Sequence, residues 1–306
     1  MPFLIIFQDS VLPLFLIAGI AALYQRIARP DIKQLADAAV LVFAPVFVLN
    51  SLVAEDVTWT ALQGPLIFMV LLTACLMLLG WGASRLLRLE EEDALALVLA
   101  CSMINVGNFG LPLIHFAYGE QALNASVLVF VVFNLPLGTV AICLASKNTA
   151  GAEMLRDVAR IPIFHAMVAA LLLTTLGVSL PEALGKGLNL LGEAAIPLLI
   201  FVLGLQLAEI GVSRRMRDLA LILVVAVVIR LLLSPGLALG ITHFLDFSGL
   251  ERDVAVVQTS GPAALLPLMY SIRFGRRTEL LASIILVTSL ASAVTMPLVI
   301  AGMNWL

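Results

Sequence analysis

The sequence predicts an all-α integral membrane protein with ten transmembrane helices, arranged as two inverted repeats of five helices. Three observations predict this class. First, 62% of the 306 residues are hydrophobic and only 12% are charged, which leaves too few polar residues to cover a water-facing globule. Second, ten apolar segments of membrane-spanning length follow one another along the chain. Third, the basic residues alternate between the intervening loops.

Apolar segments bounded by charged or turn residues place the ten spans. They are expected at residues 10–25, 35–54, 65–87, 94–118, 122–146, 161–178, 190–209, 219–244, 254–274 and 279–303. The longest connection, 147–160, separates two halves of five spans each. We therefore expect a first repeat at 1–148, a cytoplasmic linker at 149–160 and a second repeat at 161–306.

The placement of Lys and Arg supports this number of spans. Of the 17 basic residues, all but three lie in loops that follow odd-numbered spans. Lys186 and Arg252 lie in loops after even-numbered spans, and Arg230 falls inside span eight. Because cytoplasmic loops are enriched in basic residues, we expect the odd-numbered loops to be cytoplasmic and both termini to lie outside. A miscounted span would have disturbed the alternation.

Prolines at matching places indicate a repeat, which must be inverted because each half has an odd number of spans. Pro45 and Pro197 open apolar runs in spans two and seven. Leu-Pro-Leu steps at Pro112 and Pro267 interrupt spans four and nine, and spans five and ten each carry a late proline. Three such pairs in the same order favour two related halves.

Span four contains the stretch with the most polar character, Asn-Val-Gly-Asn-Phe-Gly-Leu-Pro at 105–112. Two Asn, two Gly and a Pro inside an apolar segment interrupt the helix, and the freed polar groups must face protein or a cavity because lipid cannot satisfy them. The second half-helix then directs free N–H groups and a partial positive charge at the break. Since the same holds after Pro267, the two ends predict a mid-membrane pocket for an anion such as a carboxylate.

Candidate substrate-binding residues follow from these two breaks. In span four they are amide donors, glycines that allow close backbone approach and the proline: Asn105, Gly107, Asn108, Gly110 and Pro112. In span nine they are the polar and flexible positions Gln258, Ser260, Gly261 and Pro262, with Pro267. The alternative is that these residues kink packed helices and bond only to neighbouring backbone.

Four further polar residues in apolar spans are candidates. Asn50 and Gln206 either contact the substrate or hold helices together. Arg230, near the middle of span eight, either neutralises an anionic substrate, pairs with a carboxylate, or extends to a membrane interface. His115 is either a substrate donor that titrates near neutral pH or a structural histidine.

The motif at 105–112, closed by Tyr118-Gly119, resembles the auxin efflux carrier family of secondary transporters, which includes plant auxin exporters and bacterial carriers of malonate, malate and related organic acids. The second half adds Pro-Ala-Ala at 262–264, Arg-Phe-Gly at 273–275 and Thr-Met-Pro-Leu at 295–298. One departure is Thr-Ser-Gly before Pro262, where a bulkier residue is expected.

This resemblance implies a fold similar to bile acid symporters and sodium/proton antiporters. Spans one, two, six and seven would form a scaffold and often a homodimer interface. Spans three to five and eight to ten would form a transport domain that carries the crossing of broken spans four and nine across the membrane in an elevator-like movement.

The function predicted is secondary transport of a small organic anion across the bilayer of the bacterial inner membrane. The alternatives are an anion channel and a carrier of a non-anionic solute. No intramembrane nucleophile or metal-ligand constellation points to an enzyme, a metal or a cofactor. Basic residues are dispersed, which argues against nucleic acid as a partner. Since acidic residues fall in loops or near span ends, we expect no dedicated Asp/Glu relay for a coupling ion.

Overall fold

A computed structural model of the chain describes residues 3–145, 160–210 and 219–305, except for the side chains at 135–139 and 142. Most of the expected linker at 149–160 therefore lies outside the described residues. Within these ranges the chain is helical, with an isolated β-bridge between Ile104 and Ala263. Helices long and apolar enough to cross a membrane occupy Phe3–Ala28, Ile32–Ala54, Trp59–Leu86, Glu182–Glu209, Ala220–Phe244 and Glu279–Met303. The chain is therefore a helical, multi-pass membrane protein.

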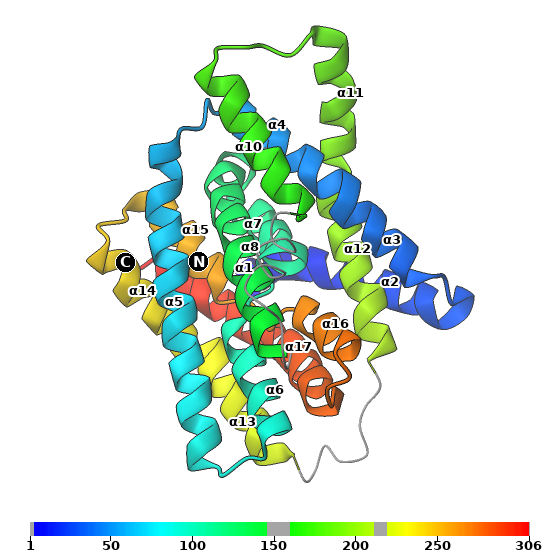
Figure 1. The fold of residues 1–306 in the computed structure, drawn as a ribbon, viewed down its shortest axis with the longest axis vertical. Coiled ribbons are helices and arrows are strands. Elements are labelled where there is room, and N and C mark those ends of the chain that lie inside the picture. The colour runs from blue at the N-terminus through cyan, green and yellow to red at the C-terminus, as the bar shows by residue number, and fades with distance from the viewer. Residues whose placement is uncertain (1–2, 146–159, 211–218, 306) are drawn as a thin grey trace.

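The helices coincide in position with the expected spans. The first half contains α1 (Phe3–Ile6), α2 (Leu12–Ala28), α3 (Ile32–Ala38), α4 (Ala44–Ala54), α5 (Trp59–Leu86), α6 (Glu91–Ser102), α7 (Leu111–Tyr118) and α8 (Leu123–Ala145). The second half contains α10 (Pro162–Thr175), α11 (Glu182–Glu193), α12 (Ala195–Glu209), α13 (Ala220–Val227), α14 (Ser234–Phe244), α15 (Gly249–Thr259), α16 (Leu266–Arg273) and α17 (Glu279–Met303). Figure 1 shows them packed into one helical body.

Prolines explain a recurring irregularity in these helices. Widened π-helical turns at Phe7–Val11, Ala39–Phe43, Val106–Gly110 and Val228–Leu233 lie immediately before α2, α4, α7 and α14, each of which has a proline in its first two positions. A proline lacks an N–H and its ring collides with the carbonyl of the preceding turn. The widened turn relieves this collision while the helix continues.

The two expected breaks occur, but earlier in the chain than the prolines predict. Helix α6 ends at Ser102 and helical structure resumes at Val106, so the irregular stretch is 103–105. Helix α15 ends at Thr259 and α16 begins at Leu266. Pro267 lies in the first turn of α16, where a proline is preorganised for a helix and no N–H is missed. Pro112 lies at the start of α7, directly after the widened turn that begins at Val106.

Packing divides the helices into two groups. In one, α12 packs on α2 and α3, and α10 and α11 pack on α4. In the other, α5 packs on α6, α8 and α14, and α15 packs on α14. In the same group α7 and α16 pack on α8, and α6 and α13 pack on α17. Gly204 lets α2 and α12 approach closely, because a Cβ atom there would overlap the backbone of Ala18. We refer to these as the α2 group and the α5 group.

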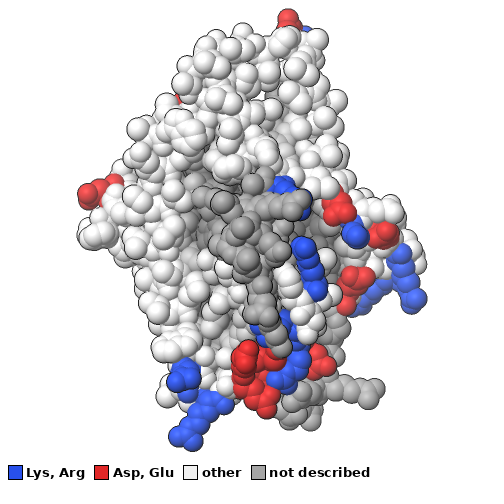
Figure 2. All heavy atoms as spheres, viewed as in Figure 1, with Lys and Arg blue, Asp and Glu red and all other residues white. Residues whose placement is uncertain are grey.

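Charge is segregated to the ends of the helices. In Figure 2 the basic side chains gather along the lower and right edges, and the broad surface above them and to the left is almost uncharged. The α2–α3, α5–α6 and α16–α17 loops lie along those edges in Figure 1. We call this the basic side. The α4–α5, α10–α11 and α14–α15 loops lie toward the upper and left edges, here called the far side.

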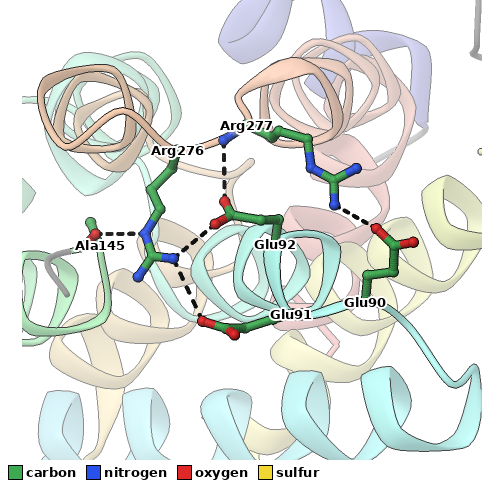
Figure 3. A network of polar contacts seen from close by, with 6 residues as sticks. All are labelled: Glu90, Glu91, Glu92, Ala145, Arg276 and Arg277. Carbon is green, nitrogen blue, oxygen red and sulfur yellow. Dashed lines mark hydrogen bonds and ion pairs between the residues drawn. The ribbon is translucent and has the colours of Figure 1, made fainter.

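A network of ion pairs and hydrogen bonds lies at the basic side of the α5 group (Figure 3). The guanidinium of Arg276 binds Glu92 at 2.9 Å and donates to the carbonyl of Ala145 at 2.9 Å. Arg277 donates its backbone N–H to Glu92 and its guanidinium binds Glu90 at 2.7 Å. The hydrogen bond to Glu90 raises the pKa of Arg277. These contacts fasten the α16–α17 loop to the start of α6 and the end of α8.

Candidate functional site

The two irregular stretches meet and pair with each other through their backbones. The N–H of Asn105 donates to the carbonyl of Pro262 at 3.0 Å, and the N–H of Ala264 donates to the carbonyl of Met103 at 2.8 Å. These two bonds flank the bridge between Ile104 and Ala263. Backbone groups that leave the helical ladder are thus satisfied within the protein, as the membrane interior requires. We call this place the crossing.

Arg230 lies beside the crossing and is fully buried. Its Nε donates to the carbonyl of Gly261 at 2.9 Å. Nη1 donates to the carbonyl of Cys101 at 3.3 Å, and Nη2 donates to the carbonyl of Thr259. Cys101 and Thr259 belong to the last turns of α6 and α15, whose carbonyls have no intrahelical partner. The guanidinium therefore holds the carboxyl ends of both half-helices together. No carboxylate among the described residues lies within 4.0 Å of it.

Side chains of span nine complete the crossing. Gln258 is fully buried, and its Nε2 donates to the carbonyls of Val106 at 3.0 Å and Ser126 at 3.1 Å. The hydroxyl of Ser260 donates back to Val256 at 2.6 Å, within its own helix. Gly110 fits against Gln258, whose Cγ would be 2.8 Å from an added Cβ. In this structure Gln258 thus contacts the partner half of the crossing and packs against Gly110, whereas the Ser260 hydroxyl bonds to neighbouring backbone.

A cavity of about 250 Å³ lies beside the crossing, between the α2 group and the α5 group. Four of the sequence candidates line it: Asn105, Gly107, Asn108 and Gln206. Its wall toward the basic side is formed by Gln206 near the end of α12 and by six residues from α3 to the start of α4: Ala36, Asp37, Ala39, Val40, Leu41 and Ala44. We therefore call it the basic-side cavity. Its volume is just under the usual range for ligand pockets, which suits a small solute.

The half-helices that follow the two breaks, leading into α7 and α16, both begin at this cavity. Val106 and Asn108 in the first turn before α7, and Leu265 and Leu266 at the start of α16, form part of the lining. The first N–H groups of a helix have no intrahelical partner and carry a partial positive charge. The crossing therefore separates the helix ends: the negative ends face Arg230 and the positive ends face the basic-side cavity.

Asn105 adds an unpaired donor at the same place. Its side chain is 6% exposed, and among the described residues its Nδ2 has no hydrogen-bond partner. Gln206, across the cavity in the α2 group, likewise has an unpaired buried Oε1. Buried polar groups are almost always paired, so an exception calls for an explanation. A polar ligand in the basic-side cavity would supply the missing acceptor for Asn105.

A second cavity of about 850 Å³ opens toward the far side and contains two more candidates. Asn50 lines it and donates to the carbonyl of Leu188 at 2.8 Å, so it links α4 to α11. His115 lines it, packs beside Phe116 and has an Nδ1 without a partner among the described residues. The candidates therefore separate into residues of the basic-side cavity, residues of this far-side cavity and residues of the crossing.

Sequence reasoning missed several residues that shape these sites. Phe130, Phe133 and Asn134 of α8 line the basic-side cavity, and Asp37 is the charged residue among its described lining. Thr288 of α17 accepts the N–H of Ala263 at 3.3 Å. Asn134 had a usable signal, because it is a polar residue inside an apolar span. The other residues became relevant only through packing between distant segments.

Comparison with known proteins identifies the class of this membrane protein. The family described as "Membrane transport protein" matches residues 6–154 and 148–300. The chain belongs to this family, which is the auxin efflux carrier family that its motifs resemble.

Two archaeal relatives carry the same general description. An uncharacterized transporter of Methanothermobacter thermautotrophicus is 28% identical over 300 residues, covering 94% of this chain and 95% of the relative. An uncharacterized transporter of Methanocaldococcus jannaschii is 27% identical over 225 residues, covering 72% of this chain and 70% of the relative. The similarity thus extends over most of each protein and supports membrane transport as the class of activity.

Proposed function

We propose that this protein is a secondary transporter of a small organic anion, which binds in the basic-side cavity at the crossing. The unpaired amide of Asn105, placed where two helix N-termini meet, carries this proposal. An anion's carboxylate accepts hydrogen bonds from such an amide and from free backbone N–H groups, and helix N-termini favour negative charge.

The charge on Arg230 also supports an anionic substrate. It is a buried cation whose contacts are dipoles, with no acidic partner among the described residues. A neighbouring negative charge is therefore favourable in the low-dielectric interior. The walls of the cavity are otherwise mostly apolar, with Phe130, Phe133 and Leu199 among them. This combination suits a solute with a carboxylate head and a small apolar body.

The arrangement of the two helix groups supports an elevator movement. We propose ten spans forming two inverted repeats, with α1–α4 and α10–α12 as the scaffold and α5–α8 and α13–α17 as the transport domain. Both cavities are lined by residues of both groups, for example Asn105 and Gln206 in the basic-side cavity, and His115 and Asn50 in the far-side cavity. Sliding one group past the other would expose the crossing alternately to the two sides.

The proposal extends to the orientation of the protein in the membrane and to its oligomeric state. Because cytoplasmic loops are enriched in basic residues, we propose that the basic side faces the cytoplasm and that both termini lie outside, with the protein in the cytoplasmic membrane. The family resemblance favours a homodimer joined through the scaffold. Cross-linking of the purified protein in membranes would detect the dimer.

One specific observation favours the alternative of a non-anionic solute. Asp37 at the basic-side cavity, and Glu55, Glu120 and Glu193 at the far-side cavity, are carboxylates, and the described lining of neither cavity includes Lys or Arg. These carboxylates would repel an approaching anion unless it arrives protonated. A transporter of a neutral or cationic solute has no such obstacle.

The test is transport by the purified full-length protein in proteoliposomes. Charge movement is recorded after addition of a panel of small organic acids, with and without Na⁺ and pH gradients. We expect a saturable current for one of the acids. Asn105→Ala should lower the apparent affinity for that acid about 10- to 100-fold, because a hydrogen bond to a charged group is lost. Asn304→Ala, an exposed Asn beyond the end of α17, is the matched control.

The outcomes separate the candidates. A saturable anion current whose apparent affinity falls in the Asn105→Ala variant and is unchanged in the Asn304→Ala variant supports the proposal. Movement of only neutral or cationic solutes would show that the anion pocket is wrong and favour the alternative. Flux that does not saturate with substrate would instead identify a channel.

A further inference from the structure

Three backbone carbonyls from two helices converge on a single buried guanidinium. Cys101 comes from α6, and Thr259 and Gly261 come from the end of α15 and the stretch that follows it. The hydroxyl of Ser234 also lies 3.4 Å from the carbonyl of Thr259. Since each helix carboxyl end carries a partial negative charge, two such ends side by side repel each other unless a cation lies between them.

Converging carbonyl oxygens are the ligands with which proteins replace the hydration shell of small inorganic cations. The oxygens of Cys101, Thr259 and Gly261 therefore form the kind of site that a monovalent cation binds. Here the chain's own side chain occupies it. Arg230 reaches it from the turn between α13 and α14, and the guanidinium spreads one charge over several donors.

Arg230 is also separated from the proposed substrate site. None of the described residues that line the basic-side cavity comes from α13 or α14. Its contacts instead lead to the cavity through the backbone: Gly261 is followed by Pro262, whose carbonyl accepts the N–H of Asn105. Arg230 can thus position Asn105 without touching the substrate.

We propose that Arg230 is a tethered cation, a positioning residue whose guanidinium occupies the place of an inorganic monovalent cation between the ends of α6 and α15. The crossing is complete without a bound ion, so the wild-type protein needs no Na⁺ or K⁺ to hold the crossing together. Removing the guanidinium creates a cation site. This inference concerns the crossing itself and stands whether or not the substrate is an anion.

The test is thermal unfolding of the purified full-length protein in detergent, in buffers of equal ionic strength containing choline, Na⁺, K⁺ or millimolar methylguanidinium. Arg230→Ala is expected to lower Tm by roughly 5 °C or more in choline, because buried carbonyls lose a charged donor. Methylguanidinium or a small inorganic cation is expected to restore at least half of that loss. The wild-type Tm should be the same in all four buffers.

Arg230→Met is the matched control, because its uncharged side chain fills more of the vacated space than Ala and presents an apolar methyl group to the carbonyls in place of a cation. Ions should not restore its Tm. If added cations raise the Tm of the Ala variant no more than that of the Met variant, the proposal is overturned. Stabilisation of the wild type by Na⁺ or K⁺ would overturn it as well.

Arg230→Lys covers the case in which the Ala variant does not fold. Its ammonium keeps the charge at the carbonyls, so its Tm should lie between those of the wild type and the Met variant. A Lys variant no more stable than the Met variant would also overturn the proposal. None of these readouts needs the substrate, so a failure here is distinguishable from a failure of anion transport.

Discussion

The backbone N–H of Asn105 donates to the carbonyl oxygen of Pro262 over 3.0 Å, so the break in one helix is hydrogen-bonded to the break in the other. The reciprocal bond from Ala264 to Met103 makes the two breaks a paired unit. A residue of the first half can thus be displaced by a change in the second half. Substitutions on either side of the crossing should affect both the stability of the protein and the placement of Asn105.

Gly110→Ala tests the close packing of the crossing. The added Cβ would lie 2.8 Å from Cγ of Gln258 and 3.3 Å from the carbonyl oxygen of Asn105. Gln258 cannot move freely because its amide is bonded to Val106 and Ser126. We expect a destabilisation of about 1–3 kcal/mol, typical of overpacking, measured by thermal unfolding in detergent.

Gly82→Ala in α5 is its control, because an added Cβ there meets no atom within 4 Å. Alanine is favoured over glycine in a helix interior, so this variant should be unchanged or slightly stabilised, by up to about 1 kcal/mol. Equal stability of the two variants would contradict the tight fit at the crossing.

Gly204→Ala tests the contact within the α2 group. Its Cβ would overlap the backbone of Ala18, and a backbone cannot turn aside as a side chain can. Helices α2 and α12 must therefore separate, at an expected cost of about 2–4 kcal/mol in stability. Gly19→Ala, next to Ala18 in α2, has open space and should change stability by less than about 0.5 kcal/mol. Comparable thermal unfolding of the two variants would argue against this close approach.

The ion-pair network at the basic side yields a comparison between neighbouring arginines. The Arg276 side chain is 6% exposed and binds both Glu92 and Ala145. Arg276→Ala should destabilise the protein by roughly 2–3 kcal/mol, since it removes the buried guanidinium that binds Glu92 and the carbonyl of Ala145. Arg277 makes an exposed pair with Glu90, and Arg277→Ala should unfold at the wild-type temperature. The opposite ranking in thermal unfolding would show that burial of Arg276 is unimportant.

Local composition was sufficient to predict the interrupted spans. The polar stretch at 105–112 and the prolines of span nine marked both breaks, because backbone that leaves a helix in a membrane needs small and polar residues. Their exact positions were missed. Pro112 and Pro267 were expected at the breaks, but the irregular stretches lie before them: Pro267 is in the first turn of α16, and Pro112 follows the widened turn 106–110. A proline signals both a helix break and a helix start, and sequence alone does not separate the two.

Side-chain roles at the crossing were less accessible from the sequence. Arg230 was recognisable as a costly buried charge, and its expected partners were a substrate or a carboxylate. In the structure its guanidinium instead donates hydrogen bonds to the backbone carbonyls of Cys101, Thr259 and Gly261. Backbone acceptors carry no sequence signal, since every residue has one. Asp37 could not be identified for a related reason: it lies near the end of α3 and reaches the cavity rim only through the packing of α3 against α12.

Asp37 provides a test of the charge of the substrate. It is an exposed residue on α3 and the charged group among the described lining of the basic-side cavity. Asp37→Asn removes this negative charge and keeps the shape of the side chain. If the substrate is an anion, its apparent affinity in the proteoliposome assay should rise by about 2- to 5-fold, and the gain should shrink at high salt.

Asp31→Asn is the matched control on the same helix. Asp31 caps α3 by accepting the N–H of Lys33 at 3.0 Å, and Asn is an equally good cap, so the helix is preserved while the net charge changes by the same amount. Asp31 is not part of the cavity lining, so its substitution should leave affinity unchanged. A fall in affinity specific to Asp37→Asn would instead indicate a cationic solute, because the carboxylate would then be an attractive contact.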